Sequence, residues 1–186
     1  RAKGGVAALG LVGDGSPLVA GHEPCGVVAA VGEGVPEALA KAGDRVMDPH
    51  YSGCGVCKHC RDGWSQLCLD GAMVYGATGH GAHAKYMKLP AHTLVKLPDA
   101  LSYNTGAAIS CGTGTAYGAL KRLDLAGGKT IAIFGQGPVG LSATQLAKVM
   151  GARVIALDIG DERLELAKKF GADEVIDPGK NDVVEA

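Results

Sequence analysis

The chain has 186 residues, of which 47% are hydrophobic, enough for one substantial core or two small ones. Its formal net charge of −1 argues against a nucleic-acid-binding module, which normally carries a basic face. No apolar run approaches the roughly 20 residues that a membrane-spanning helix needs, so we expect no membrane segment and a cytoplasmic protein.

Up to about Ala100, the apolar runs are short and bounded by turn residues, which is typical of a β-rich lobe. The pattern predicts strands over 27–31, 45–47, 84–89 and 93–96. Residues 103–123 favour a helix interrupted by Gly112 and Gly114. Cys25 is interpreted as a core residue, and His50, His80 and His83 as solvated or structurally bonded side chains more readily than as proton carriers.

Four cysteines are closely spaced between residues 54 and 68, at Cys54, Cys57, Cys60 and Cys68. Thiolate sulfur is a preferred zinc donor, and four such ligands complete a tetrahedral shell with no position left for a substrate. The spacing therefore predicts a structural zinc site. Disulfides or solitary buried thiols are the alternatives, and the sequence shows no secretory signal that would favour disulfides.

From about Thr130 the periodicity changes to alternating strands and helices. We expect a strand over 130–134, a helix over 138–150, a strand over 153–158, a helix over 161–170 and a strand over 174–176. This βαβαβ order predicts a parallel sheet with helices on its faces.

A GxGxxG turn follows the strand expected to end at Phe134 and opens the next helix. Its glycines permit a tight turn, close approach of a pyrophosphate and close helix packing, and the helix N-terminus favours phosphate. An acid eighteen residues later can accept hydrogen bonds from ribose hydroxyls and would repel a 2′-phosphate, so NAD is favoured over NADP; a helix N-cap or a solvated loop acid is the alternative. The predicted cofactor-binding residues are Gly135, Gly137, Pro138, Val139, Gly140 and Asp158.

Residues 21–32 contain Gly21, His22 and Glu23, followed by Gly26, Val28, Val31 and Gly32. This set resembles the GHExxGxVxxVG signature of zinc-dependent medium-chain alcohol dehydrogenases. The four cysteines, the Gly-Asp-Arg-Val turn at 43–46, the segment 111–115 and the glycine turn follow in that family's order. Taken alone, His22 would be a polar turn residue and Cys111 a small buried hydrophobe.

The resemblance implies an α/β protein with a GroES-like catalytic domain over 1–111, including the zinc lobe 54–68. It also implies the N-terminal half of a Rossmann cofactor domain over 112–186, with a catalytic zinc in the cleft between the domains. His22 and Cys111 match two ligands of that zinc and, with Glu23, are the implied catalytic residues; Glu23 lies beside the metal and in some members of the family can coordinate it. Thr115 matches a contact to the nicotinamide. The family's first cysteine ligand has no counterpart between Arg1 and Gly21, and we expect it ahead of residue 1.

The implied activity is zinc-dependent and NAD-linked interconversion of a small alcohol or polyol with its aldehyde or ketone by hydride transfer. The implied cofactors are NAD and two zinc ions, one structural and one catalytic, in a homodimer or homotetramer. Two alternatives remain: a zinc-free quinone or enone reductase of the same superfamily, and a non-catalytic, zinc-stabilised NAD-binding protein. The zinc-free reductases lack the Gly-His-Glu ligands and the four-cysteine lobe.

Overall fold

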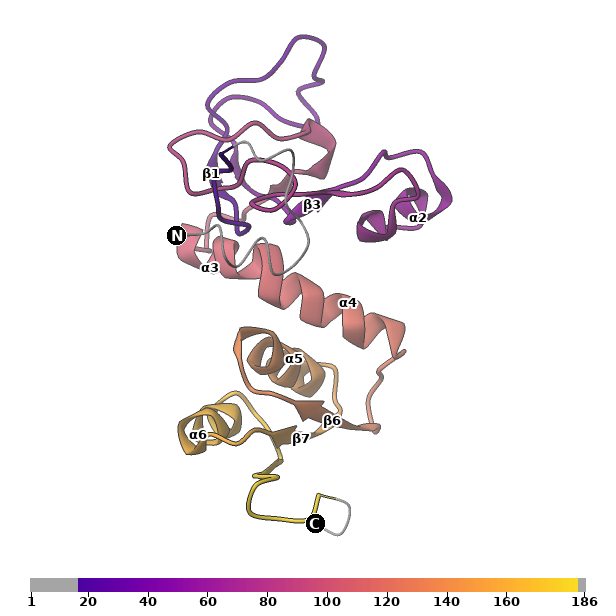
Figure 1. Cartoon of the computed structure of the whole chain (residues 1–186), viewed down its shortest axis with the longest axis vertical. Coiled ribbons are helices and arrows are strands. Elements are labelled where there is room, and N and C mark those ends of the chain that lie inside the picture. The colour runs from indigo at the N-terminus through magenta and orange to yellow at the C-terminus, as the bar shows by residue number, and fades with distance from the viewer. Residues whose placement is uncertain (1–16, 184–186) are drawn as a thin grey trace. The chain divides into compact units, whose positions relative to one another are not determined.

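The computed structural model describes residues 17–183 (Figure 1). The chain divides into two compact units, Arg1–Cys111 and Gly112–Ala186. The first contains a three-stranded sheet and a two-stranded sheet, and the second contains a three-stranded sheet. Within the described part of the chain, no helix is long and apolar enough to cross a membrane.

The larger sheet of the first unit is antiparallel, in the order β1 (Cys25–Val27), β2 (Arg45–Met47) and β5 (Val95–Lys96). Val46 at its centre lies opposite Gly26 on one side and Lys96 on the other. The strand predicted over 45–47 is confirmed. The one predicted over 27–31 is misplaced: it begins at Cys25 and ends at Val27, and Val31 beyond it is exposed.

Two further expectations for the first unit are corrected by the structure. Residues 84–89 form no strand, because Lys85 and Tyr86 are both exposed and offer no buried face to pack. Residues 93–96 contain the end of a 3-10 helix, η2 (Ala91–Thr93), before the two residues of β5.

A smaller antiparallel sheet, which the sequence did not predict, frames the cysteine segment. It pairs β3 (Tyr51–Ser52) with β4 (Met73–Val74), and between these strands lie the helix α2 (Lys58–Arg61) and the 3-10 helix η1 (Ser65–Leu67). Figure 1 shows the segment that carries α2 projecting away from the rest of its unit. Strands of two residues are too short to show a period of two in the sequence.

The segment 103–122 is helical but changes its hydrogen-bonding pattern along its length. Helix α3 (Tyr103–Ala108) begins after Ser102, whose Oγ accepts the Thr105 N–H at 3.1 Å. A π-helical turn, η3 (Ile109–Thr113), follows, and α4 (Gly114–Arg122) resumes the α-helical pattern. The predicted interruption at Gly112 and Gly114 is therefore this π-turn, a feature often found at functional sites.

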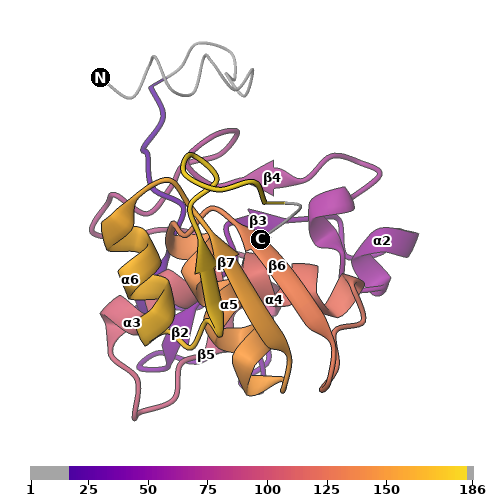
Figure 2. The ribbon, with the colours of Figure 1, turned by 90° about the horizontal axis from the view of Figure 1, so that it is seen from below.

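The second unit confirms the predicted βαβαβ order. It contains β6 (Thr130–Phe134), α5 (Pro138–Val149), β7 (Arg153–Leu157), α6 (Asp161–Lys169) and β8 (Glu174–Ile176). The strands are parallel in the order β6-β7-β8, and Figure 2 shows β6 and β7 side by side. Ala143 and Ala147 of α5 pack with Leu120 of α4 and Val154 of β7, and these small alanines allow the helix to approach the sheet closely.

One acid of the first unit is buried without a matching partner. Asp48 is 1% exposed, and neither carboxylate oxygen has a hydrogen-bond partner among the described residues. The buried Tyr75 hydroxyl also has no hydrogen-bond partner among the described residues. Burial raises the pKa of Asp48 to about 6, although the nearby Thr93 hydroxyl opposes this shift. The native state therefore holds a proton on Asp48 at pH values where the unfolded chain has lost it.

Replacing Asp48 with Asn should stabilise the protein at pH 7 by about 2 kcal/mol, because an uncharged amide avoids the cost of a buried carboxylate. The folded pKa is raised, so wild-type stability is lost as pH rises through about 6, and the advantage of Asn should shrink at pH 5. Tyr75, which faces Asp48, has a pKa raised by burial and stays neutral throughout this range. Denaturant midpoints at pH 7 and pH 5 measure the effect, and an equal gain at both would contradict it.

Candidate metal and cofactor sites

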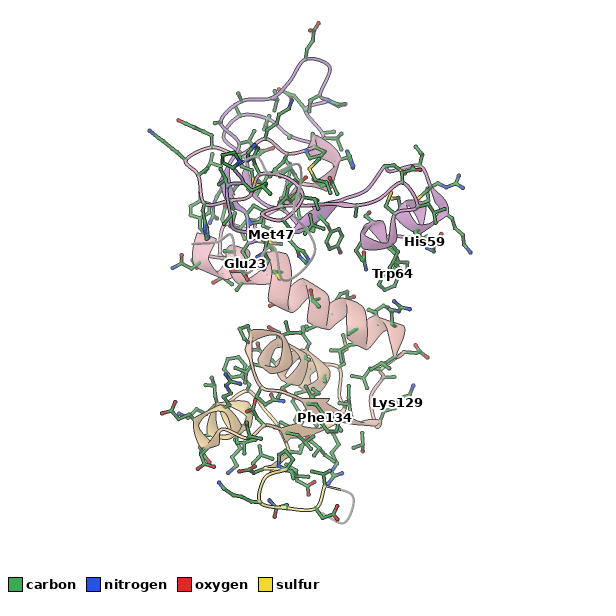
Figure 3. All side chains as sticks on the ribbon, viewed as in Figure 1. Glu23, Met47, His59, Trp64, Lys129 and Phe134 are labelled. Atoms are coloured by element: carbon green, nitrogen blue, oxygen red, sulfur yellow. The ribbon has the colours of Figure 1, made fainter. Side chains whose placement is uncertain are left out.

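The four cysteines of the lobe converge on one point. The sulfur atoms of Cys54, Cys57, Cys60 and Cys68 all lie within 4.8 Å of one another. None of the six cysteines of the chain forms a disulfide. His59 and Trp64, labelled in Figure 3, mark the lobe that carries the cluster. Four thiols this close, without a disulfide, match the donor set of a tetrahedral zinc site.

Backbone groups hold the thiols in place. The N–H of Cys54 donates to the sulfur of Cys68 at 3.3 Å, and the N–H of Cys57 donates to the sulfur of Cys54 at 3.4 Å. A Cβ at Gly53 would lie 2.5 Å from the sulfur of Cys60, so only glycine fits there. The N–H groups of Leu69 and Cys60 lower the pKa of Cys57 to about 6, which favours its thiolate, whereas the pKa values of Cys54 and Cys60 are raised.

Replacing Cys57 with Ser should lower the melting temperature by about 10 °C, because a structural metal contributes folding free energy and loses one of its four donors. The affinity for NAD should stay unchanged, since the glycine turn lies in the other unit. Differential scanning fluorimetry and NAD titration measure the two quantities. Cys25→Ser is the matched control, and an equal loss of stability and NAD affinity in Cys57→Ser would contradict the assignment.

A second group of potential ligands lies in the first unit. The structure brings His22, Glu23 and Cys111 together, with one ligand atom of each within 4.8 Å of the other two. His22 and Glu23 are exposed and Cys111 is half-buried, so the group is accessible to solvent. Imidazole, carboxylate and thiolate form a mixed donor set that suits zinc.

The π-turn carries Cys111 to this group. Ser110, buried in the same turn, places its hydroxyl 3.0 Å from the carbonyl oxygens of both Pro24 and Gly106, to which it can donate. Pro24 directly follows Glu23, so this contact ties the Cys111 turn to the Gly-His-Glu segment. No local pattern indicated a role for Ser110, because its partner Pro24 is 86 residues away.

Two aromatic side chains lie beside the group. The His50 ring is 5.7 Å from the His22 ring, and Tyr51 packs edge-on against His50 at 4.8 Å. His80, in contrast, accepts the N–H of Val19 at 3.4 Å, which confirms its interpretation as a structurally bonded residue. His50, one of the three histidines that the sequence left ambiguous, thus lies beside a candidate ligand.

The glycine turn has the geometry that its sequence predicts. Gly135 adopts a left-handed conformation with φ +83°, and a Cβ at Gly140 would lie 1.8 Å from the Gly135 carbonyl oxygen. Gly137 caps α5, and Pro138 is its first residue. The buried Gln136 donates from Nε2 to the Ile133 carbonyl and accepts from the Thr144 hydroxyl, so it anchors the turn to both strand and helix. Thr115 is exposed on the first turn of α4.

Asp158 follows β7 and bonds to the glycine turn. Its Oδ2 accepts the Gln136 N–H at 2.6 Å, and its Oδ1 accepts the Gly160 N–H at 3.1 Å. The Gln136 N–H, with help from the Gly160 N–H and Arg163, lowers its pKa despite burial, so it is ionised at neutral pH. Asp158 is not a helix N-cap, because Gly160 occupies that position in α6. It is not a solvated loop acid either, because it is buried.

Arg163 was missed by sequence reasoning. Its guanidinium nitrogen lies 3.5 Å from Oδ2 of Asp158, although its side chain is 62% exposed. A basic residue in the first turns of the helix after the acidic residue was the signal that could have indicated it. An exposed cation beside the predicted ribose acceptor can reach a ligand placed there.

Comparison with known proteins finds relatives of both units. Residues 5–99 match the model of the alcohol dehydrogenase GroES-like domain, and residues 138–186 match that of the zinc-binding dehydrogenases. An Escherichia coli K12 protein named uncharacterized zinc-type alcohol dehydrogenase-like protein is 46% identical over 83% of this chain and 44% of its own length. An alcohol dehydrogenase of Geobacillus stearothermophilus is 44% identical over 91% of this chain and 50% of its own.

Among solved structures, the cobalt- and zinc-bound thermostable alcohol dehydrogenase of Pyrobaculum aerophilum aligns with a TM-score of 0.84 and 31% identity, over 94% of this chain and 53% of its own. The chain spans about half the length of the relatives it matches. A GroES-like unit followed by part of a Rossmann unit is the architecture shared with these dehydrogenases. The chain belongs to the zinc-type medium-chain alcohol dehydrogenase family.

Proposed function

We propose that this chain is part of a zinc-dependent, NAD-linked oxidoreductase that interconverts a small alcohol or polyol and its aldehyde or ketone by hydride transfer. The observation that carries the proposal is the convergence of His22, Glu23 and Cys111, whose ligand atoms lie within 4.8 Å of one another. Cys111 comes from a part of the chain distant from the adjacent His22 and Glu23, and no local structure requires them to meet. A metal is the simplest reason for an imidazole, a carboxylate and a thiol to meet.

The donor chemistry fits a catalytic zinc. A neutral His22 and a Cys111 thiolate would hold the ion. Glu23 would lie beside it, where its carboxylate would change the electrostatic field at the ion and assist the exchange of bound ligands. Zinc bound there supplies Lewis-acid polarisation of an alcohol or carbonyl oxygen and lowers the pKa of the hydroxyl. The partial exposure of all three side chains leaves room for a small substrate. His50, packed against His22, and Tyr51, packed against His50, would line the approach to it.

The cofactor contacts fall to the second unit. The turn from Gly135 to Gly140 and the start of α5 would receive the pyrophosphate at a helix N-terminus. The ionised Asp158 uses one N–H donor on each oxygen, and its remaining lone pairs would accept the ribose hydroxyls of NAD. Arg163 would approach the same ribose. Thr115 would contact the nicotinamide end.

The four cysteines of the lobe are proposed to hold a structural zinc, which does no chemistry because four protein ligands complete its shell. A zinc-free reductase of the same superfamily explains neither ligand group. A non-catalytic, zinc-stabilised NAD-binding protein explains the lobe and the glycine turn but not the convergence at Cys111. We further propose a cytoplasmic homodimer or homotetramer that binds neither nucleic acid nor membrane.

Metal analysis of the purified protein with a panel of alcohols, polyols and NAD tests the function. Two zinc ions per chain with NAD-dependent oxidation of at least one alcohol is the expected result. One zinc and no turnover would favour the non-catalytic alternative. No zinc, with NAD(P)H-dependent reduction of a quinone or enone, would favour the zinc-free reductase.

A further inference from the structure

The backbone of residues 81–83 is hydrogen-bonded to residues 19–21, immediately ahead of His22. Three backbone hydrogen bonds join them: Gly81 N–H to Val19 O at 2.7 Å, Ala82 N–H to Gly21 O at 2.9 Å, and His83 N–H to Ala20 O at 2.8 Å. Since Gly21 precedes His22 and Glu23, these bonds set the position from which both side chains extend. No role was assigned to Gly81 or Ala82 from the sequence.

The contact leaves no space for a side chain. A Cβ at the buried Gly81 would lie 2.0 Å from the Gly21 carbonyl oxygen and 2.7 Å from that of Ala20. Both are backbone atoms, so no rotamer change could relieve the overlap, and the segment 19–21 would have to move. Gly21 is equally constrained, with φ +95° and a Cβ position 2.5 Å from the His83 ring.

We propose that Gly81 is a positioning residue for the metal held by His22, Glu23 and Cys111, an inference that rests on the proposed function. Cys111 is held by a different element, the π-turn anchored through Ser110 to Pro24. The segment that carries His22 and Glu23 is therefore held at both ends, by residues 81–83 at residues 19–21 and by Ser110 at Pro24. Metal sites require ligand distances correct to about 0.2 Å, so a small displacement at Gly21 separates His22 from Cys111.

The experiment compares Gly81→Ala with Gly79→Ala in the purified protein. Gly79 lies two residues earlier, and its Cβ would meet only side-chain atoms of Met73, the sulfur at 2.8 Å and Cγ at 2.9 Å; this side chain is flexible and exposed and can move away, unlike the backbone atoms that meet Gly81. Zinc stoichiometry and affinity are measured, together with the visible spectrum after cobalt substitution, which distinguishes a tetrathiolate site from a mixed one. Gly81→Ala should weaken the second metal by about 10- to 100-fold and retain the four-cysteine metal. Gly79→Ala should retain both.

Retention of both metals in Gly81→Ala, with wild-type affinity and cobalt spectrum, would overturn the inference and leave the proposed function standing. Loss of both metals would also overturn it, because Gly81 would then serve the folding of the whole unit. A wild-type protein that binds only the four-cysteine metal would contradict the proposed function itself, and this inference with it.

Discussion

Replacing Cys111 with Ser is expected to lower kcat/KM for NAD-linked alcohol oxidation by about a thousandfold. The Cys111 sulfur is one of three ligand atoms within 4.8 Å, and the Ser hydroxyl is a much weaker zinc donor than thiolate. A Lewis-acid contribution of several kcal/mol would be lost, and each 1.4 kcal/mol corresponds to about tenfold in rate. Steady-state kinetics and zinc analysis measure the loss, which should accompany the departure of one zinc ion of two.

The matched control is Cys25→Ser, which changes a half-buried cysteine outside both ligand groups. It should leave activity and zinc content close to wild type. NAD affinity of Cys111→Ser should also be unchanged, because the glycine turn belongs to the other unit. A Cys111→Ser protein with full activity, or one that loses the four-cysteine zinc instead, would refute the assignment of Cys111.

The double variant Asp158→Ser with Ile159→Arg is expected to raise the ratio of catalytic efficiencies for NADP over NAD by about a hundredfold. Removing the carboxylate abolishes repulsion of a 2′-phosphate, and an arginine supplies a bidentate partner worth about 1.5–3 kcal/mol. Ile159 is 77% exposed, so the new side chain meets no packing constraint. Kinetics with both cofactors give the ratio. The catalytic efficiency should also fall somewhat with both cofactors, because Asp158 accepts the Gln136 N–H that fixes the glycine turn.

Asp161→Ser provides the control for this change. Asp161 is an exposed acid at the start of the next helix, paired with Lys180, and is outside the predicted cofactor contacts. Its replacement should leave the cofactor ratio unchanged. An unchanged ratio in the Asp158 double variant would show that this carboxylate only holds the turn and does not face the ribose.

The second unit was predictable from sequence because its elements are long enough to show their period. The strand 130–134 and the helix from Pro138 were assigned from apolar patterning and a glycine turn, and the structure confirms both. The first unit was harder. Its strands contain two or three residues, so periodicity placed one strand wrongly at 84–89 and missed β3 and β4.

The two ligand groups also differ in how far they could be predicted from the sequence. The four cysteines lie within fifteen consecutive positions, 54–68, so spacing alone indicated one site. His22 and Cys111 could be connected only through the family resemblance, because no local pattern relates them. Long-range contacts such as Ser110 with Pro24 and Gly81 with Gly21 depend on tertiary packing and leave no periodic trace.

A crystal structure of the zinc-loaded protein, with anomalous difference maps recorded on either side of the zinc absorption edge, tests the central claim most directly. Two zinc peaks are predicted. One should lie among the four cysteine sulfurs, and the other at about 2.0–2.1 Å from a His22 ring nitrogen and about 2.3 Å from the Cys111 sulfur. A peak in the lobe with none beside His22 and Cys111, at saturating zinc, would contradict the catalytic metal site.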